Sequence, residues 1–263
     1  MTAVTEGAPL AETDAELAAR LATQAGEHLL DVRGRLVAEE AHPWELMDAG
    51  DLAAQRFIAA ELTRLRPGDA VLSEEGFEDP RRFDGGRVWI IDPLDGTREF
   101  GEAGRSDWAV HIALWEEDHF VAAAVALPAV GLTFATDPAP VVPPTTRPRP
   151  RVVTSRSRAP YATVLVANAI GADAVRLGSA GAKAMAVVLG EADVYVHDGG
   201  MYQWDSAAPA AVALAAGLHV SRLDGTPIVY NHRDPWLPDF MICRKELADD
   251  VLDALWGDRR TVV

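Results

Sequence analysis

Two aspartates with a proline between them form the densest group of chemically capable residues in the sequence. Residues 89–97 read WIIDPLDGT, so an apolar run leads directly into Asp92 and Asp95. Pro93 fixes its own φ and turns the chain, so the two carboxylates can point to a common centre. Close carboxylates repel each other unless a cation lies between them, and oxygen ligands of this kind suit Mg²⁺ or Mn²⁺. The spacing therefore indicates a metal site. The alternative is an Asx turn in which both side chains are solvated.

The residues around this pair extend the site toward an anion and toward further carboxylates. Gly96 lets the backbone approach a ligand closely, and Thr97 opens a short helix or turn with free N–H groups and a hydroxyl. Glu74 ends a preceding strand in SEEG, and Asp205 starts an apolar helix in WDSAA. As alternatives, Glu74 belongs to a charged loop and Asp205 is a simple helix N-cap. Together, these acidic segments form a recognisable constellation of candidate metal ligands.

The chain as a whole carries a net charge of −16, so binding of an anionic substrate needs metal ions or a local group of basic residues. The basic residues are therefore candidates for substrate selection. Arginines gather between residues 147 and 158. Arg147 and Arg149 lie among prolines and are predicted to face solvent on a linker, whereas Arg156 follows a strand. Lys183 lies near the start of a helix that opens with Gly178, where a helix N-terminus and a lysine suit a second phosphate. The alternative is a surface lysine on an amphipathic helix.

The elements that must position these residues follow from hydrophobic periodicity and turn signals. A capping box of Thr13 and Glu16 precedes a helix predicted over residues 14–36, and a second apolar stripe over residues 54–65 ends at Pro67. Six prolines between Asp137 and Pro150 exclude a central strand or helix interior there. The first half is predicted to hold strands at 71–73 and 87–91 and a hairpin of 108–115 and 120–127. The second half is predicted to alternate as an α/β part: strand 151–154, helix 161–170, helix 180–190, strand 192–197 and helix 205–217.

Composition limits the class of protein. A chain of 263 residues with 49% hydrophobic and 24% charged residues is globular, with one large or two small domains. The single cysteine, Cys243, cannot form a disulfide within the chain, which fits a reducing compartment. The sequence contains neither a secretory signal nor an apolar run of about 20 residues, so we expect a cytoplasmic protein. The acidic charge predicts that nucleic acid polymers and membranes are not partners, and dinucleotide-binding and P-loop motifs are absent from the sequence.

These motifs resemble those of the inositol-monophosphatase-like metal-dependent phosphatases. The N-terminal family motif is similar to residues 92–97 and the C-terminal motif to residues 204–209, and the order of blocks fits from about residue 14 to residue 231. Within the family, the chain is most similar to the bacterial CysQ-type 3′-phosphoadenosine-5′-phosphate phosphatases. The resemblance implies an α+β fold, a layered α-β-α-β-α sandwich. It divides the chain into an N-terminal metal-binding α+β subdomain, 1–150, and a C-terminal α/β subdomain, 151–263, that completes the active site.

The resemblance also implies residue roles. For two or three Mg²⁺ ions per site, with Mn²⁺ as a substitute, it implies the ligands Glu74, Asp92, the Leu94 carbonyl, Asp95 and Asp205. The implied catalytic residues are Glu74, Thr97 and Asp51. The implied substrate-binding residues are Asp95, Gly96, Thr97, Ser155, Arg156, Ser179, Lys183 and Asp205. Asp51 lies in DAGD where the family has Thr-x-Ala-Asp, and its alternative is a surface helix cap.

The function that the resemblance implies is hydrolysis of the 3′-phosphate of 3′-phosphoadenosine 5′-phosphate to AMP and phosphate, by metal-activated water, in sulfate assimilation. Sensitivity to lithium and a homodimer are also implied. Asp92 and Asp95 are three residues apart, whereas aspartyl-phosphate phosphatases use Asp-x-Asp, so the spacing favours a metal–water mechanism over a phosphoenzyme. The alternatives are an inositol-1-phosphate or fructose-1,6-bisphosphate phosphatase, including one that acts on several substrates, and a non-catalytic metal- and phosphate-binding regulatory protein.

Overall fold

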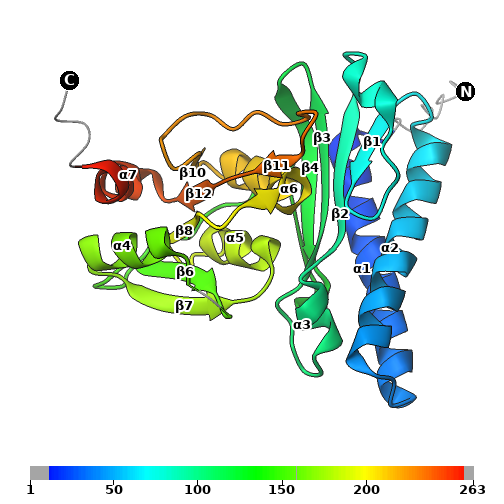
Figure 1. The fold of residues 1–263 in the computed structure, drawn as a ribbon, viewed down its shortest axis with the longest axis horizontal. Coiled ribbons are helices and arrows are strands. Elements are labelled where there is room, and N and C mark those ends of the chain that lie inside the picture. The colour runs from blue at the N-terminus through cyan, green and yellow to red at the C-terminus, as the bar shows by residue number, and fades with distance from the viewer. Residues whose placement is uncertain (1–11, 158, 258–263) are drawn as a thin grey trace, which may run out of the picture.

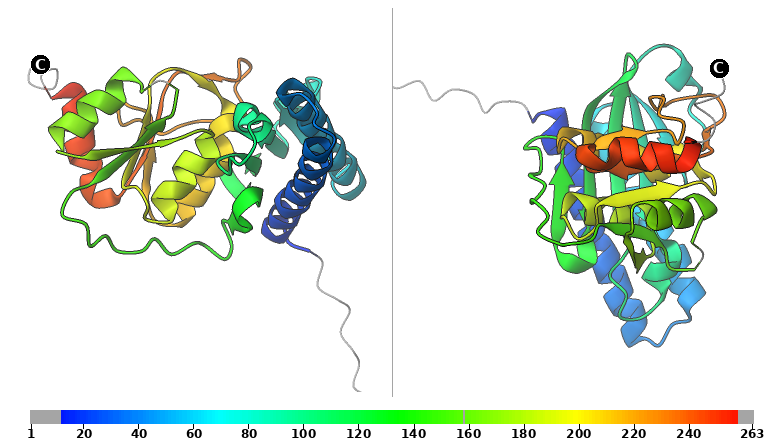
Figure 2. Two further views of the ribbon diagram at one scale, coloured as in Figure 1. Left: turned by 90° about the horizontal axis from the view of Figure 1, so that it is seen from below. Right: turned by 90° about the vertical axis from the view of Figure 1, so that its left-hand side faces the viewer.

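Helices and sheets alternate as layers in this protein (Figure 1, Figure 2). The computed structural model describes residues 12–157 and 159–257. The described residues form two five-stranded sheets, with helices outside each sheet and between the two. The layered α+β architecture is therefore confirmed. From right to left in Figure 1, the helical layers are α1 (Asp14–Ala38) with α2 (Pro43–Leu65), α6 (Gln203–Ala215) with α5 (Ala180–Val188), and α4 (Tyr161–Ala169) with α7 (Ala248–Trp256).

The first sheet carries the Asp92–Asp95 segment. Its strand order is β1-β2-β3-β4-β5, with β1 and β2 parallel and the other neighbours antiparallel. The predicted strands and hairpin are confirmed, but the second strand continues through Pro93 to Asp95, with a register shift between Asp92 and Asp95. The fifth strand was not predicted. The bounds are β1 (Ala70–Ser73), β2 (Val88–Asp95), β3 (Ala109–Glu116), β4 (His119–Leu127) and β5 (Leu132–Ala135).

The second sheet has the strand order β10-β12-β8-β6-β7, in which β6 is parallel to both β7 and β8. The predicted strands and helices of this half are confirmed, whereas the other strands of this sheet and the last helix were not predicted. The bounds are β6 (Arg151–Ser155), β7 (Asp173–Leu177), β8 (Val194–His197), β10 (His219–Ser221) and β12 (Phe240–Cys243). A separate two-stranded sheet pairs β9 (Met201–Tyr202) with β11 (Trp236–Leu237). The short helices are α3 (Thr97–Gly101) and the 3₁₀ turns η1 (Pro80–Phe83), η2 (Pro128–Val130) and η3 (Lys245–Leu247).

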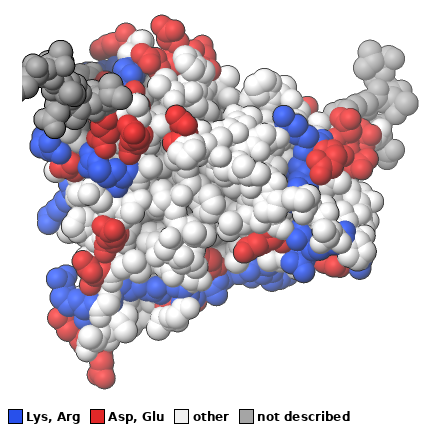
Figure 3. All heavy atoms as spheres, turned by 180° about the vertical axis from the view of Figure 1, so that it is seen from behind, with Lys and Arg blue, Asp and Glu red and all other residues white. Residues whose placement is uncertain are grey.

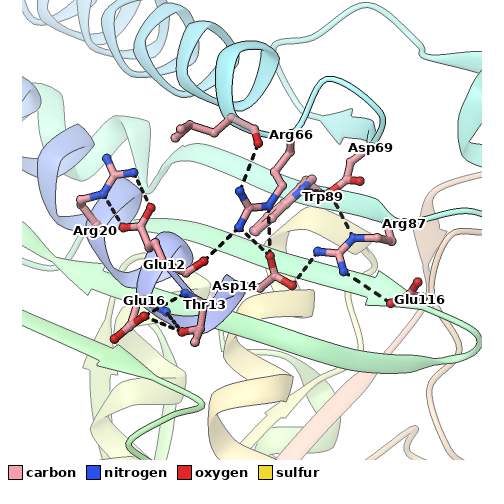
Figure 4. Close-up of polar contacts among 11 residues, drawn as sticks. Glu12, Thr13, Asp14, Glu16, Arg20, Arg66, Asp69, Arg87, Trp89 and Glu116 are labelled. Atoms are coloured by element: carbon pink, nitrogen blue, oxygen red, sulfur yellow. Dashed lines mark hydrogen bonds and ion pairs between the residues drawn. The ribbon is translucent and has the colours of Figure 1, made fainter. Parts of the chain in front are cut away.

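A network of ion pairs ties the start of α1 to the strand that carries the acidic motif (Figure 4). The predicted capping box of Thr13 and Glu16 is present. Asp14 accepts from Arg66 at the end of α2 at 3.0 Å and from Arg87 at the start of β2 at 2.6 Å. Because one carboxylate joins α1, α2 and β2, the outer helices are fixed in register with the strand that leads into the site.

The proline-rich segment, residues 137–150, connects the two sheets and is held to the rest of the protein by hydrogen bonds. Residues 137–150 contain neither helix nor strand, and Arg149 is exposed, both as predicted. The prediction for Arg147 was wrong, because its guanidinium donates to the Gly190 carbonyl at 2.7 Å and to Asp193 at 2.9 Å. Asp193 is 1% exposed, and a buried carboxylate needs such partners. The division into subdomains at residue 150 stays a prediction, since α6 packs against strands of both sheets.

Three features relate to the composition of the chain: the surface charge, the character of the helices and the single cysteine. On the face shown in Figure 3, charged side chains gather around the rim and the centre is mostly uncharged. No helix among the described residues is both long and apolar enough to cross a membrane. Cys243 is buried and is not in a disulfide.

Candidate active site

The turn between β2 and α3 places the first two carboxylates. Gly96 adopts a φ of +87°, a conformation that favours glycine, and a Cβ there would lie 3.0 Å from the Cβ of Ser179. Asp92 Oδ1 accepts from the Leu94 N–H at 3.1 Å, which is an Asx-type contact. Asp92 and Asp95 are only 1% and 7% exposed, so the alternative with both side chains solvated is wrong.

A third carboxylate from the opposite half of the chain completes an acidic cluster. One oxygen atom each from Asp92, Asp95 and Asp205 lies within 4.8 Å of the others. Asp205 is the third residue of α6 and not its N-cap, which is Tyr202, and it accepts from the Tyr202 N–H at 2.6 Å. Asp92 Oδ2 is buried and has no hydrogen-bond partner among the described residues. An unpaired buried carboxylate oxygen is costly, and hard oxygen ligands suit Mg²⁺, so the cluster fits a divalent cation.

The surroundings of these carboxyl groups shift their pKa values in different directions. Burial and the neighbouring carboxylates raise the pKa of Asp92 well above its usual range and the pKa of Asp205 to about 6. Burial alone would also raise the pKa of Asp95, but contacts from His111 and Ser179 and the charge of Lys183 lower it to about 2. Asp95 therefore stays ionised at neutral pH without a metal, whereas Asp92 gains most from a cation.

The side chain of Asp95 is held by groups that mostly lie far from it in the sequence. Its Oδ2 accepts from the Ser179 hydroxyl and from the Gly181 N–H at 2.6 Å, and His111 Nε2 lies 3.3 Å away. His111 was not predicted as a site residue, because nothing around it in the sequence resembles a metal-binding spacing. The pairing of β2 with β3, in which His111 lies directly opposite Asp92, is the signal that identifies it.

Glu74, Asp51 and Thr97 border the acidic cluster. Glu74 follows β1, and partial burial of its carboxyl together with the charges of Asp205 and Asp95 raises its pKa to about 7. Thr97 Oγ1 lies 3.1 Å from the Leu94 carbonyl oxygen and 3.5 Å from Asp51 Oδ1. The predicted pair of Asp51 and Thr97 is therefore brought together.

Asp51 does not cap a helix, which excludes its alternative role. It lies inside α2, which begins at Pro43, well before the predicted stripe at residue 54. The missed start signal is Pro43 followed by Glu45, whose carboxylate accepts from the His42 N–H at 2.8 Å. Burial, with the charge of Glu75, raises the pKa of Asp51 to about 7.

A cavity of about 370 Å³ opens beside the cluster, and most of the predicted substrate-binding residues line it. They are Asp95, Gly96, Ser155, Ser179, Lys183 and Asp205. Thr97 and Arg156 are not among its lining residues within the described structure. A neighbouring cavity of about 730 Å³ shares Ser155 and His197 with it, so the open space continues along the ends of β6 and β8.

The two basic residues that were predicted to bind substrate differ in their hydrogen-bond partners. Lys183 is 6% exposed, and its Nζ donates to the Gly178 carbonyl and to the Ser179 carbonyl at 2.8 Å, so the alternative of a surface lysine is wrong. Arg156 pairs with Glu99 at 2.5 Å and with Glu102, both on or next to α3. A phosphate-binding role for Arg156 stays a prediction, since these carboxylates already hold its guanidinium.

The raised carboxyl pKa values predict how the stability of the metal-free protein depends on pH. The pKa of Asp51 is about 7 in the folded state against an ordinary value of 3.8, so the folded state binds more protons between these pH values. The stabilisation present at acidic pH is then lost as the pH rises through the folded pKa. The measurement is Tm in the presence of a chelator, for the unsubstituted protein and for Asp51→Asn. Between about pH 5 and about pH 8, we expect the Tm of the unsubstituted protein to fall relative to the Tm of Asp51→Asn. A Tm difference that stays constant over this range would contradict the raised pKa.

Comparisons with known proteins place the chain among phosphatases. The model of the inositol monophosphatase family matches residues 10–257. The chain is 49% identical over 255 residues to a 3′-phosphoadenosine 5′-phosphate phosphatase of Mycobacterium leprae, covering 92% of this chain and 93% of that protein. It is 32% identical over 209 residues to the 3′(2′),5′-bisphosphate nucleotidase CysQ of Escherichia coli, covering 74% and 83%.

The fold agrees with a solved structure. CysQ from Bacteroides thetaiotaomicron superposes with a TM-score of 0.72 at 26% identity, over 90% of this chain and 98% of that one. The family match spans all of the described residues, including the β2–α3 turn and the start of α6. The chain therefore belongs to the inositol monophosphatase family.

Proposed function

We propose that this protein is a Mg²⁺-dependent phosphatase that removes the 3′-phosphate of 3′-phosphoadenosine 5′-phosphate, giving AMP and phosphate, as a step of sulfate assimilation. The observation that carries the proposal is the acidic cluster of the buried Asp92 and Asp95 with the half-buried Asp205, beside a cavity that Asp95, Asp205 and Lys183 line. Family membership makes the protein a metal-dependent phosphatase of small phosphorylated metabolites. The names of the relatives support the nucleotide as substrate.

Four carboxylates and one backbone carbonyl are the proposed metal ligands. Asp92, Asp95 and Asp205, with Glu74 and the Leu94 carbonyl, would hold the metal ions. When bound, Mg²⁺ supplies Lewis-acid chemistry that neutralises the phosphate dianion and lowers the pKa of water.

The groups next to the ligands would handle the proton and the phosphate. Asp51, with a pKa of about 7, can accept a proton at neutral pH and lies 3.5 Å from the Thr97 hydroxyl, so this pair would orient and deprotonate the attacking water. The Gly96 and Thr97 N–H groups would hold the phosphate. Because water can attack directly, the proposal requires no covalent nucleophile.

An aromatic group at the cavity favours a nucleotide over a sugar or inositol phosphate. Pairing of β9 with β11 sets Trp236 opposite Tyr202, and both residues line the cavity. Trp236 is 47% exposed and packs edge-on against Tyr202, which stacks on Trp204 with 4.7 Å between ring centroids. A Cβ at Gly200 would lie 1.9 Å from the Trp236 ring, so this glycine lets the ring lie against the backbone. Exposed aromatic faces suit stacking by a purine base.

The proposal is tested by phosphate release with Mg²⁺ on 3′-phosphoadenosine 5′-phosphate, inositol 1-phosphate and fructose 1,6-bisphosphate, each with and without Li⁺. We expect the highest kcat/KM for the nucleotide. Trp236→Leu should raise KM for the nucleotide about 5- to 150-fold, because base stacking contributes roughly 1–3 kcal/mol, and leave KM for inositol 1-phosphate unchanged. Trp44→Leu, an exposed tryptophan on α2, is the matched control.

Other outcomes separate the alternatives. A preference for inositol 1-phosphate or fructose 1,6-bisphosphate would keep the metal site and reject the nucleotide. Failure to turn over any of the substrates would favour the non-catalytic binding protein. An equal rise in KM for the nucleotide and for inositol 1-phosphate in Trp236→Leu would show that the ring shapes the cavity without contacting a base.

A further inference from the structure

The proposed mechanism leaves one buried ionisable side chain beside the carboxylates unused. His111 in β3 is fully buried, and each ring nitrogen faces a different part of the site. Nε2 lies 3.3 Å from Asp95 Oδ2, and Nδ1 lies 3.2 Å from the carbonyl oxygen of Trp204. The imidazole therefore spans from the β2–α3 turn to the first turn of α6, which carries Asp205.

The hydrogen-bonding chemistry of these partners fixes the orientation of the ring. A carbonyl oxygen only accepts, so Nδ1 carries the hydrogen that it donates to Trp204. With Nδ1 held in this way, Nε2 lies 3.3 Å from Asp95 Oδ2, and a ring that carries hydrogen on both nitrogens can donate to both partners. The Ser179 hydroxyl and the Gly181 N–H approach the same Asp95 oxygen, Oδ2. Because these groups all contact Oδ2, Oδ1 is the oxygen that Asp95 can offer to a cation.

The glycine at position 181 shows that the neighbouring helix is shaped around this ring. Gly181 is the second residue of α5, where glycine is a weaker helix former than alanine. A Cβ at this position would lie 2.1 Å from His111 Nε2 and 2.9 Å from the Ala109 side chain. Any larger residue would thus displace the imidazole from Asp95.

We propose that His111 is a positioning residue that holds Asp95 of β2 and the Trp204–Asp205 turn of α6 in one arrangement, and thereby sets the affinity of the site for a divalent cation. The inference rests on the metal site of the proposed function, but not on the identity of the substrate. Its physical basis is that outer groups which orient ligating carboxylates strengthen metal binding. Its alternative is that the ring only fills space between β3 and α6.

The test measures Mn²⁺ binding to the metal-free protein by titration calorimetry, without substrate. We expect His111→Ala to weaken Mn²⁺ binding about 10- to 100-fold, the range found when such outer groups are removed. His111→Asn should be affected less, because its amide can still donate to one of the two partners. The matched control is Ile112→Ala: Ile112 is the next residue of β3, is equally buried, and packs in the opposite layer against α1 and α2. It should lower Tm and leave the Mn²⁺ affinity unchanged.

Gly181→Ala provides a second, independent test, because the added methyl group displaces the His111 ring without removing it. We expect it to weaken Mn²⁺ binding in the unsubstituted protein and to have a smaller additional effect in the His111→Ala background. The proposal is overturned if His111→Ala keeps its Mn²⁺ affinity within about twofold while Tm falls as in Ile112→Ala. If the unsubstituted protein does not bind Mn²⁺, the metal site itself is rejected. Failure to hydrolyse the nucleotide would reject only the substrate.

Discussion

Replacing Asp95 with asparagine is expected to lower kcat/KM for the preferred phosphomonoester by about a thousandfold or more. The substitution removes a charge that stays ionised at neutral pH, since contacts from His111 and Ser179 and the charge of Lys183 lower the pKa of Asp95 to about 2. It also leaves the metal cluster with a weaker ligand. Loss of several kcal/mol of transition-state stabilisation, at about 1.4 kcal/mol for each tenfold in rate, accounts for the size of the effect.

The control for Asp95→Asn is a nearby carboxylate outside the acidic cluster. Asp198 lines the neighbouring cavity and accepts from the Ala162 N–H at 2.9 Å. Asp198→Asn should keep kcat/KM within a few-fold and show how much a lost carboxylate charge matters on its own. Circular dichroism and Tm establish that both variants are folded. If folded Asp95→Asn turned over substrate at the normal rate, Asp95 would have no part in the reaction.

Removal of divalent metal is expected to abolish turnover completely and reversibly. Burial and the repulsion between neighbouring carboxylates raise the pKa values of Asp92 and Asp205, so the site cannot bind a phosphate dianion without added positive charge. Phosphate release should stop after dialysis against EDTA and return with Mg²⁺. Mg²⁺ should also raise Tm, because it binds the folded state and not the unfolded chain.

The control for chelation is EDTA already saturated with Mg²⁺, which should leave both turnover and Tm unchanged. The outcome that would contradict the metal mechanism is full turnover by protein in which elemental analysis finds no divalent metal. A rise in Tm without a return of activity would show that the metal binds but that another step was lost in dialysis.

The sequence by itself determined the features whose signals are local. The capping box of Thr13 and Glu16 starts α1 because both groups lie within one turn of helix. The apolar run before Asp92, with Pro93 and Gly96, predicts a strand followed by a tight turn, and the structure forms both. The family resemblance rests on the same short motifs, which is why the fold class and the family follow from the sequence alone.

The strands β5, β7, β10 and β12 were missed because they are short and are stabilised by the strands they pair with. A strand of three to five residues has little periodicity of its own to distinguish it from a loop. The partner of Arg147 was missed for a similar reason. Its buried partner, Asp193, is 46 residues away in the chain, and composition among prolines predicts only exposure.

Only the tertiary structure decided how the site is assembled. Packing of α6 against the first sheet brings Asp205 within 4.8 Å of Asp92 and Asp95. The same packing places the Trp204 carbonyl and Gly181 around His111, a residue that no motif marks. Sequence patterns show which face of an element is buried. The side chain that each buried face meets depends on how all the layers pack together, and this is the reason that the ligand types could be predicted but not the groups that orient them.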